Sequence, residues 1–214
     1  MLGWLRFLLF HRRELLQLFA EHLGLVVLST ALAAAIGLPL GVWATRRRGV
    51  RRWALGAANI VQTIPSLALF GFLLPLPLIG GVGAPSAIVA LVLYSLLPIM
   101  RGAYGGIVQV DAAVREAAIA LGMTPRQRLL QVELPLALPA IFGGLRVAAV
   151  ISVGTATIAA AIGAGGLGEF IFRGLATADN RLILAGAVPA ALLALGVDGS
   201  LGALEAWLAR RYKP

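Results

Sequence analysis

The sequence predicts an all-α, polytopic membrane protein with about five transmembrane helices. Of its 214 residues, 60% are hydrophobic and only 13% are charged, and the mean hydropathy is +0.93. Long uncharged runs alternate with short clusters of arginine, and residues 53–100 contain no charge at all. A soluble domain of this size needs more polar residues to cover its surface, so the bilayer is the expected solvent. The net charge of +9 comes from arginines beside apolar runs and does not indicate a nucleic-acid partner.

Residues 1–22 begin with an apolar run that is too short to cross a bilayer. Charged residues follow this run, whereas a secretory signal peptide carries its positive charge in front. We expect an amphipathic N-terminal helix at the interface, with four residues towards lipid: Leu15, Leu16, Leu18 and Phe19. We assign no chemistry to His11 and His22 in this segment, because neither forms a recognisable metal site or lies near a nucleophile.

The later uncharged runs supply five crossings within a single transmembrane domain, residues 23–206. The first, 23–45, spans about 35 Å as a helix and ends at an arginine cluster flanked by tryptophans. The run 53–100 is too long for one helix, and its Pro- and Gly-rich part, 75–85, indicates the turn of a hairpin. The last spans are expected at 137–162 and 182–205, on either side of a glycine-rich polar loop, 163–181. Residues 207–214 form a polar tail.

The distribution of positive charge predicts the orientation of the chain. Thirteen of the 18 Lys and Arg residues fall in 46–52, 101–146 and 206–214. Cytoplasmic segments carry the excess of positive charge, so these three should face the cytoplasm. The N-terminus is then outside and the C-terminus cytoplasmic.

The segment 111–135 mixes charges with helix periodicity, and its residues predict two short helices with a bend. Asp111 suits the start of the first helix, and Gly122 suits the left-handed residue that ends it. Thr124 can cap the second helix with Gln127, and Pro125 suits its first position. Pro135 is expected to close the unit. An amphipathic helix lying on the membrane is the alternative interpretation.

The same segment resembles the EAA loop of the permeases of ABC importers. The resemblance rests on Glu116-Ala117-Ala118, Gly122, Val132 and Leu134-Pro135 at the spacing of that family. It implies that the loop docks into a groove of a cytoplasmic ATPase and couples ATP hydrolysis to transport. The implied coupling residues are Glu116, Ala117, Ala118, Gly122, Thr124, Pro125, Leu134 and Pro135.

Three further segments resemble the osmoprotectant branch of these permeases, which takes up glycine betaine, choline or carnitine: residues 62–66, 97–101 and 162–168. A permease for methionine or another amino acid is the nearest alternative, and an intramembrane enzyme is a remote one, since no catalytic set of side chains lies within the spans. The resemblance implies alternating access, an ABC ATPase, a second permease subunit (identical or a paralogue), and an extracytoplasmic substrate-binding protein. It places the chain in a prokaryotic inner or plasma membrane. ATP and Mg²⁺ would bind the partner ATPase, so this chain is expected to bind no cofactor or metal and to be no enzyme.

Candidate pore or gate residues come from two places in the sequence. Pro65 inside a span frees backbone carbonyls, which either line a cavity or are satisfied by neighbouring helices. The resemblance sets the glycine-rich loop near the pore mouth; the loop formally matches G-x-G-x-x-G, but no strand precedes it as a dinucleotide fold requires. The candidates are Gln62, Thr63, Pro65, Tyr94, Gly163, Gly165, Gly166 and Gly168.

Asp198 is an acidic residue inside the predicted fifth span. A carboxylate there is costly unless it is paired or close to water. We expect Arg146, in the fourth span, to be its partner in a structural ion pair, with a role in conduction as the alternative.

Overall fold

The computed structural model describes residues 7, 9–76 and 81–212 of the chain. Every regular element in these residues is helical, as the sequence predicts. The principal helices are α2 (Arg12–Arg46), α4 (Gly56–Thr63), α5 (Ser66–Leu73), α6 (Ala84–Val108), α7 (Ala112–Ala120), α8 (Pro125–Arg128), α9 (Leu134–Ala159), α10 (Gly168–Thr177) and α11 (Asn180–Arg211). Short helical turns lie between them at Arg48–Val50 (α3), Arg51–Leu55, Leu129–Glu133 and Ala160–Ile162.

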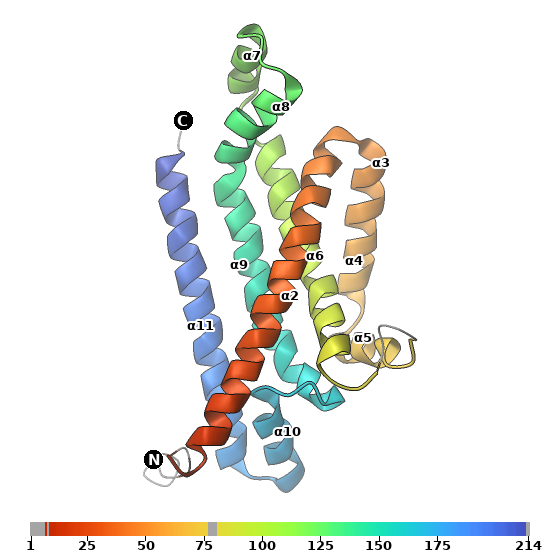
Figure 1. Ribbon diagram of the computed structural model, residues 1–214, viewed down its shortest axis with the longest axis vertical. Helices are drawn as coiled ribbons and strands as arrows, with labels where there is room; N and C mark the ends of the chain where they lie inside the picture. The colour runs from red at the N-terminus through yellow and green to blue at the C-terminus, as the bar shows by residue number, and fades with distance from the viewer. Residues whose placement is uncertain (1–6, 8, 77–80, 213–214) are drawn as a thin grey trace.

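The described residues contain four or five candidate membrane spans, which confirms the predicted number. α2, α6, the run from α8 through α9, and α11 are each long and apolar enough to cross a bilayer. The helices on either side of Ile64 make a fifth candidate, bent by 104°. α7 and α8 project from one end of the bundle, where α11 ends, while α10 and the start of α2 lie at the opposite end (Figure 1).

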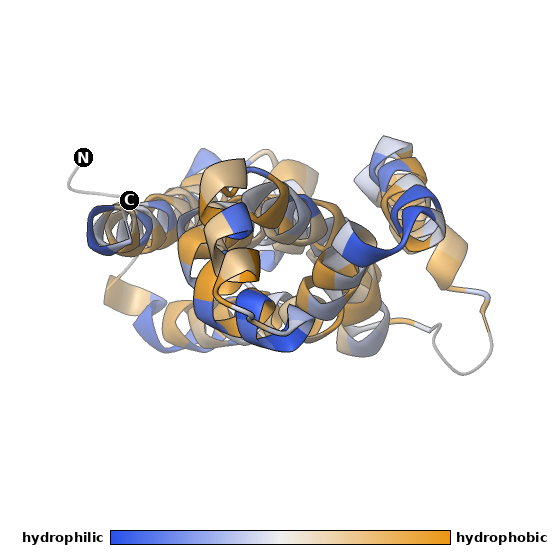
Figure 2. Cartoon of the chain, turned by 90° about the horizontal axis from the view of Figure 1, so that it is seen from above, coloured by the Kyte–Doolittle hydropathy of each residue, from blue (hydrophilic) through white to orange (hydrophobic). Residues whose placement is uncertain are grey.

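α6 forms the centre of the bundle, packed between α2 and α9, and α11 packs on the far side of α9 (Figure 1). Glycines allow these helices to approach closely. A Cβ on Gly41 of α2 would lie 2.8 Å from the Met100 carbonyl oxygen, and one on Gly102 would lie 2.7 Å from that of Ala140. Backbones in contact maximise dispersion between helices that gain little from the hydrophobic effect in lipid. Seen from above, the sides of the helices are largely apolar (Figure 2).

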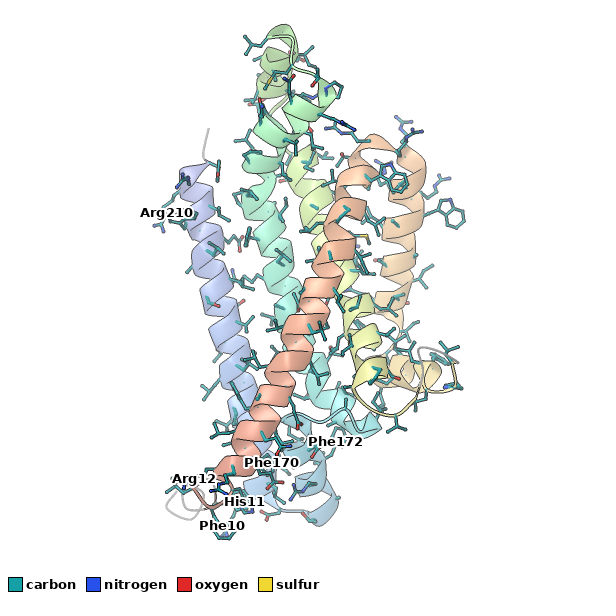
Figure 3. The ribbon with its side chains drawn as sticks, in the orientation of Figure 1. Phe10, His11, Arg12, Phe170, Phe172 and Arg210 are labelled. Atoms are coloured by element: carbon teal, nitrogen blue, oxygen red, sulfur yellow. The ribbon has the colours of Figure 1, made fainter. Side chains whose placement is uncertain are left out.

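The helix that contains the N-terminal residues does not end at residue 22. Residues 12–22 are the first turns of α2 and continue without a break into the span, through Gly24. Leu18 does not face lipid as expected, because it is buried in a cluster with Leu167 and Phe170. Figure 3 shows Phe170 close to the start of α2. The predicted first part of the N-terminal helix, residues 1–6 and 8, lies outside the described residues.

The segment 163–181 contains a helix, so the expectation of an irregular loop is wrong for most of its length. α10 occupies Gly168–Thr177 and turns Phe170 and Gly174 inwards. Gly174 packs against the backbone of Ile183 at the start of α11, which holds the two helices together. Gly163, Gly165 and Gly166 lie in the turn before α10, whereas Gly168 is its first residue.

Pro135 does not close the coupling segment, because the chain stays helical from Pro125 to Ile162. The π-helical turn Leu129–Glu133 immediately precedes it, and Pro135 lies in the first turn of α9. Pro135 has no N–H to donate, and the helix continues past it with the π-helical turn in place of a regular α-helical turn just before it. The second short helix is therefore the projecting end of the fourth span.

Candidate functional site

The bend between α7 and α8 is built by local capping, as the sequence predicts. The Asp111 carboxylate accepts a hydrogen bond of 2.8 Å from the Ala113 amide at the start of α7. At its end, Gly122 has a φ of +74°, and the amide of Met123 donates to the Ala118 carbonyl at 3.1 Å. This hydrogen bond closes a Schellman motif, for which glycine is the favoured residue.

The second helix of this unit starts with a complete capping box. The Gln127 amide donates to the Thr124 hydroxyl at 3.3 Å, and the Thr124 amide donates to the Gln127 side chain at 2.9 Å. Pro125 is the first residue of α8. Two helix ends in one short segment are thus fixed without help from the rest of the chain.

The coupling unit, defined as residues 111–128, presents both polar and apolar groups at its surface. Glu116 and Ala117 are exposed, whereas Ala118 is buried. Ile119 and Leu121 are 54% and 82% exposed. Large apolar side chains at the tip of a polar projection suit a protein partner better than water. The remaining motif residues, Leu134 and Pro135, lie partly buried in α9 and away from this surface.

A buried carboxylate, absent from the predicted site, anchors the coupling unit to the bundle. Glu133 is 1% exposed and forms ion pairs with three arginines from three different elements. Its Oε1 lies 3.1 Å from Arg128 Nε and 3.6 Å from Arg115 Nε, and its Oε2 accepts a hydrogen bond from Arg46. We call these four residues the Glu133 anchor.

The Glu133 anchor joins the coupling unit to two spans at once. Arg46 is the last residue of α2, and Arg115 and Arg128 belong to α7 and α8. The Nη2 of Arg115 also donates to the Ile107 carbonyl of α6, at 3.2 Å. A buried ion pair constrains geometry because a displaced partner leaves a charge without compensation. The coupling unit is therefore held in one orientation relative to α2 and α6.

Four of the pore candidates surround the break between α4 and α5. At this break, side chains of the α4–α5 segment and of α6 form hydrogen bonds with free backbone carbonyls of each other. The break at Ile64 and Pro65 leaves the Ile64 carbonyl free, and the Tyr94 hydroxyl of α6 donates to it. Pro98 in α6 has no N–H for the Tyr94 carbonyl, and the Gln62 amide donates to that oxygen at 2.9 Å. Thr63 bonds its own helix, at the Ile60 carbonyl.

Of the other four candidates, three lie in the turn that follows Ala160–Ile162, and the fourth, Gly168, is the first residue of α10. Gly163, Gly165 and Gly166 all have positive φ, between +74° and +81°, a region that side chains other than glycine rarely adopt. The Gly166 amide donates to Glu21 of α2 at 3.2 Å, and Gly166 lies against the buried His22. His22 in turn contacts the Val153 carbonyl through Nε2, at 3.2 Å. Since the turn is clamped to α2 and follows a membrane helix, the nucleotide-binding interpretation has no structural basis.

The two groups of candidates do not form one site, although one core cluster connects them. Tyr94 packs in a cluster with Phe70 of α5 and with Ile162 and Ala164 at the end of α9. Gly163 faces residue 82, Gly165 and Gly166 face α2, and Gly168 packs against the last turns before the glycines. The helix break and the glycine turn are thus coupled through packed apolar side chains.

Comparison with known proteins gives the family of this helical bundle. Residues 37–214 match the model of the binding-protein-dependent transport system inner membrane components. The chain belongs to this family. It is therefore a transmembrane permease subunit of the inner membrane, and not itself an enzyme.

Named relatives resemble the permease over almost its whole length. It is 47% identical over 193 residues to the osmoprotectant import permease protein OsmW of Salmonella typhimurium, covering 89% of this chain and 90% of the relative. It is 44% identical over 200 residues to the glycine betaine/carnitine/choline transport system permease protein OpuCD of Bacillus subtilis, covering 93% and 84%.

Solved structures of ABC importers share the fold of the permease. An inward-facing form of the MetNI methionine ABC transporter superposes with a TM-score of 0.80 at 24% identity, over 91% of this chain and 95% of that one. An amino acid ABC transporter crystallised with histidines gives 0.78 at 18% identity, over 92% and 95%.

The permease also contains an ion cluster between α9 and α11. The guanidinium of Arg146 binds the Asp198 carboxylate through two hydrogen bonds, of 2.7 and 2.8 Å. A third contact, of 3.4 Å, joins Arg146 Nη1 to Glu205 Oε2, about two turns after Asp198 in α11. The expected pair of Arg146 and Asp198 is thus brought together, with Glu205 as an additional member that the sequence analysis did not assign.

We expect Asp198→Asn to lower the melting temperature and yield of the purified permease, because it leaves Arg146 with one weak contact. Arg146→Gln in the same chain should restore part of both, since no uncompensated cation then remains in the span. Thermal unfolding of the single and double variants is the measurement. A double variant less stable than either single variant would show that the two residues do not act as a pair.

Proposed function

We propose that the permease is the membrane subunit of an ATP-driven importer of quaternary-amine osmoprotectants such as glycine betaine, carnitine or choline. The observation that supports this substrate class is the identity of 47% with a permease named for osmoprotectant import and of 44% with one named for glycine betaine, carnitine and choline transport. The similarity to methionine and histidine transporters is 24% and 18% in sequence, and it supports the fold alone. Methionine remains the alternative substrate that the experiment below must test.

In this proposal the coupling unit is the docking surface for a cytoplasmic ABC ATPase, which holds ATP and Mg²⁺. Its exposed residues Glu116, Ile119 and Leu121 supply one charge and two apolar contacts. The arginine bias predicts that this end faces the cytoplasm, and α10 then faces outwards, towards an extracytoplasmic binding protein. The α11 helix is the least buried span, with 17% of its apolar window covered, and suits contact with a second permease subunit.

The test is reconstitution of the permease in vesicles with its ATPase and binding protein, followed by measurement of ATP hydrolysis with a panel of ligands. We expect glycine betaine, carnitine or choline to stimulate hydrolysis, and methionine to have no effect. A matched control carries Gly122→Leu, whose side chain opposes the left-handed residue between α7 and α8 and should abolish stimulation. Stimulation by methionine alone would overturn the substrate class and leave the importer architecture intact.

A further inference from the structure

Arg101 is the one charged residue of α6, and it lies within a candidate membrane span. It precedes the end of the helix by seven residues, which corresponds to about 10 Å along the axis. Its Nη2 donates to Asn59 of α4 at 3.0 Å. In the part of the chain that the structure describes, no carboxylate lies within ion-pair distance of its guanidinium. An arginine within a span is costly in lipid and marks a functional site unless it is paired.

The neighbouring surface of α4 is polar as well. Asn59, Gln62 and Thr63 are spaced by three and four residues, so they share one face of the helix. Asn59 and Thr63 are exposed, and Gln62 is half-buried. Each of these side chains makes one hydrogen bond within the protein, Asn59 with Arg101, Gln62 with the Tyr94 carbonyl and Thr63 with the Ile60 carbonyl. Hydrocarbon cannot satisfy their remaining hydrogen-bonding capacity, so this face suits water or another polar surface.

Arg101 and Gln62 line a hollow of about 400 Å³ between α4, α6 and α9. Gly102, Gly143 and Gly144 also line it, and at this wall α6 and α9 are in close contact, since a Cβ on Gly102 would lie 2.7 Å from the Ala140 carbonyl oxygen and one on Gly144 would lie 2.6 Å from that of Pro98. The rest of the lining is aliphatic, and none of the lining residues is acidic or aromatic. The hollow therefore offers a group for an anion and none for a cation.

We propose that this hollow is a substrate site on the transport path, and that Arg101 binds the carboxylate of zwitterionic substrates. The inference rests on the proposed function, since it takes its ligands from that class. A guanidinium binds a carboxylate through two parallel hydrogen bonds, a geometry that an ammonium group cannot reproduce. Gln62 lies at the same wall and provides a polar neighbour for the ligand.

The absence of acidic and aromatic groups from the lining makes the site selective. Quaternary ammonium groups are held by aromatic faces through cation–π attraction, and the hollow has none to offer. Glycine betaine and carnitine carry a carboxylate, whereas choline does not. Arg101 thus favours the two zwitterions on the transport path, and it repels the purely cationic substrate.

The experiment compares uptake of glycine betaine, carnitine and choline by the complete reconstituted transporter, with its ATPase and binding protein. Arg101→Gln should lower the maximal rate for both zwitterions by about tenfold, the effect of losing a charged hydrogen-bonded contact, and leave the rate for choline unchanged or higher. Arg101→Lys keeps the charge but loses the paired hydrogen-bond geometry. Its maximal rate for the zwitterions should therefore lie between those of the wild type and Arg101→Gln. Ligand affinity of the isolated binding protein serves as the reference for initial recognition. The control variant is Arg210→Gln, at the far end of α11 (Figure 3).

The outcomes separate this site from the proposed function. If the wild-type transporter moves none of the three ligands, the proposed function is overturned, and the site with it. If it moves all three and Arg101→Gln slows them equally, Arg101 serves assembly or a partner contact, and the site alone is overturned. Equal rates for wild type and Arg101→Gln would overturn it too. Retained zwitterion uptake in Arg101→Lys shows that the loss in Arg101→Gln is not a failure to fold.

Discussion

Replacing Glu133 by Gln should loosen the coupling unit from the bundle while leaving the spans inserted. The change keeps the size of the side chain and removes the charge that three arginines share. Breaking a buried ion pair costs about 3–5 kcal/mol, and the lower end applies here because the arginines retain some access to water. In the reconstituted transporter, we expect more ATP to be hydrolysed per substrate molecule, since motion of α7 and α8 no longer reaches α2 and α6.

The displacement can be measured without transport. The chain has no cysteine, so spin labels at Gly49→Cys and Arg126→Cys report only the distance between the α2–α3 turn and the coupling unit. The distribution should be narrow in the parent protein and broad in Glu133→Gln. Glu14→Gln is the matched control, because it also breaks an ion pair between elements, with Arg173, but one that is exposed and lies at the opposite end. Equal distributions in all three proteins would show that the Glu133 anchor does not position the unit.

Gly168→Ala should destabilise the permease more than any other single methyl group added at a described glycine. A Cβ at this position would overlap with the Thr157 carbonyl oxygen and lie 2.8 Å from the Ala160 Cβ. Because the first obstacle is backbone, the chain must separate α10 from the end of α9. We expect a loss of about 3 kcal/mol, the upper range for overpacking.

Gly154→Ala is the matched control, since it lies one turn before Thr157 in the same helix and has no atom within 4 Å of its Cβ position. It should be neutral, or stabilising by up to about 1 kcal/mol, the difference in helix propensity between alanine and glycine. Thermal unfolding of both variants in detergent is the measurement. A Gly168→Ala protein as stable as Gly154→Ala would mean that the contact between α9 and α10 is looser than described.

The sequence predicts what depends on neighbouring residues and on the cost of charge in lipid. Asp111, Gly122 and Thr124 define the bend of the coupling unit because capping is local. The pairing of Arg146 with Asp198, 52 residues apart, was predictable because an unpaired carboxylate in a span is expensive. The family resemblance rested on short motifs at fixed spacing, and the family match confirms it.

What the sequence does not predict depends on which elements meet. Glu133 reads as an ordinary helical residue before a span, and only folding brings Arg46 to it, 87 residues away. The one feature of the local sequence that hints at its role is its position directly before an apolar run, where an acidic residue needs a partner. Leu18 is predicted to face lipid because the sequence gives no clear sign of α10. The glycines at the start of α10 predict a loop instead of a helix. The sequence predicts that Pro135 ends the second short helix. The helix continues instead, and the π-helical turn that precedes this proline cannot be inferred from composition.

The exchange of hydrogen bonds between the α4–α5 break and α6 bears on how the chain enters the membrane. A ribosome delivers residues 51–73 before Tyr94 exists, so the Ile64 carbonyl has no partner from the protein at that moment. A free carbonyl is unfavourable in hydrocarbon, and the bent segment cannot settle there alone. In α6, the Tyr94 carbonyl likewise has no donor at Pro98 until the Gln62 side chain lies beside it. The two segments therefore leave the insertion machinery as one unit, and biogenesis of this hairpin is cooperative.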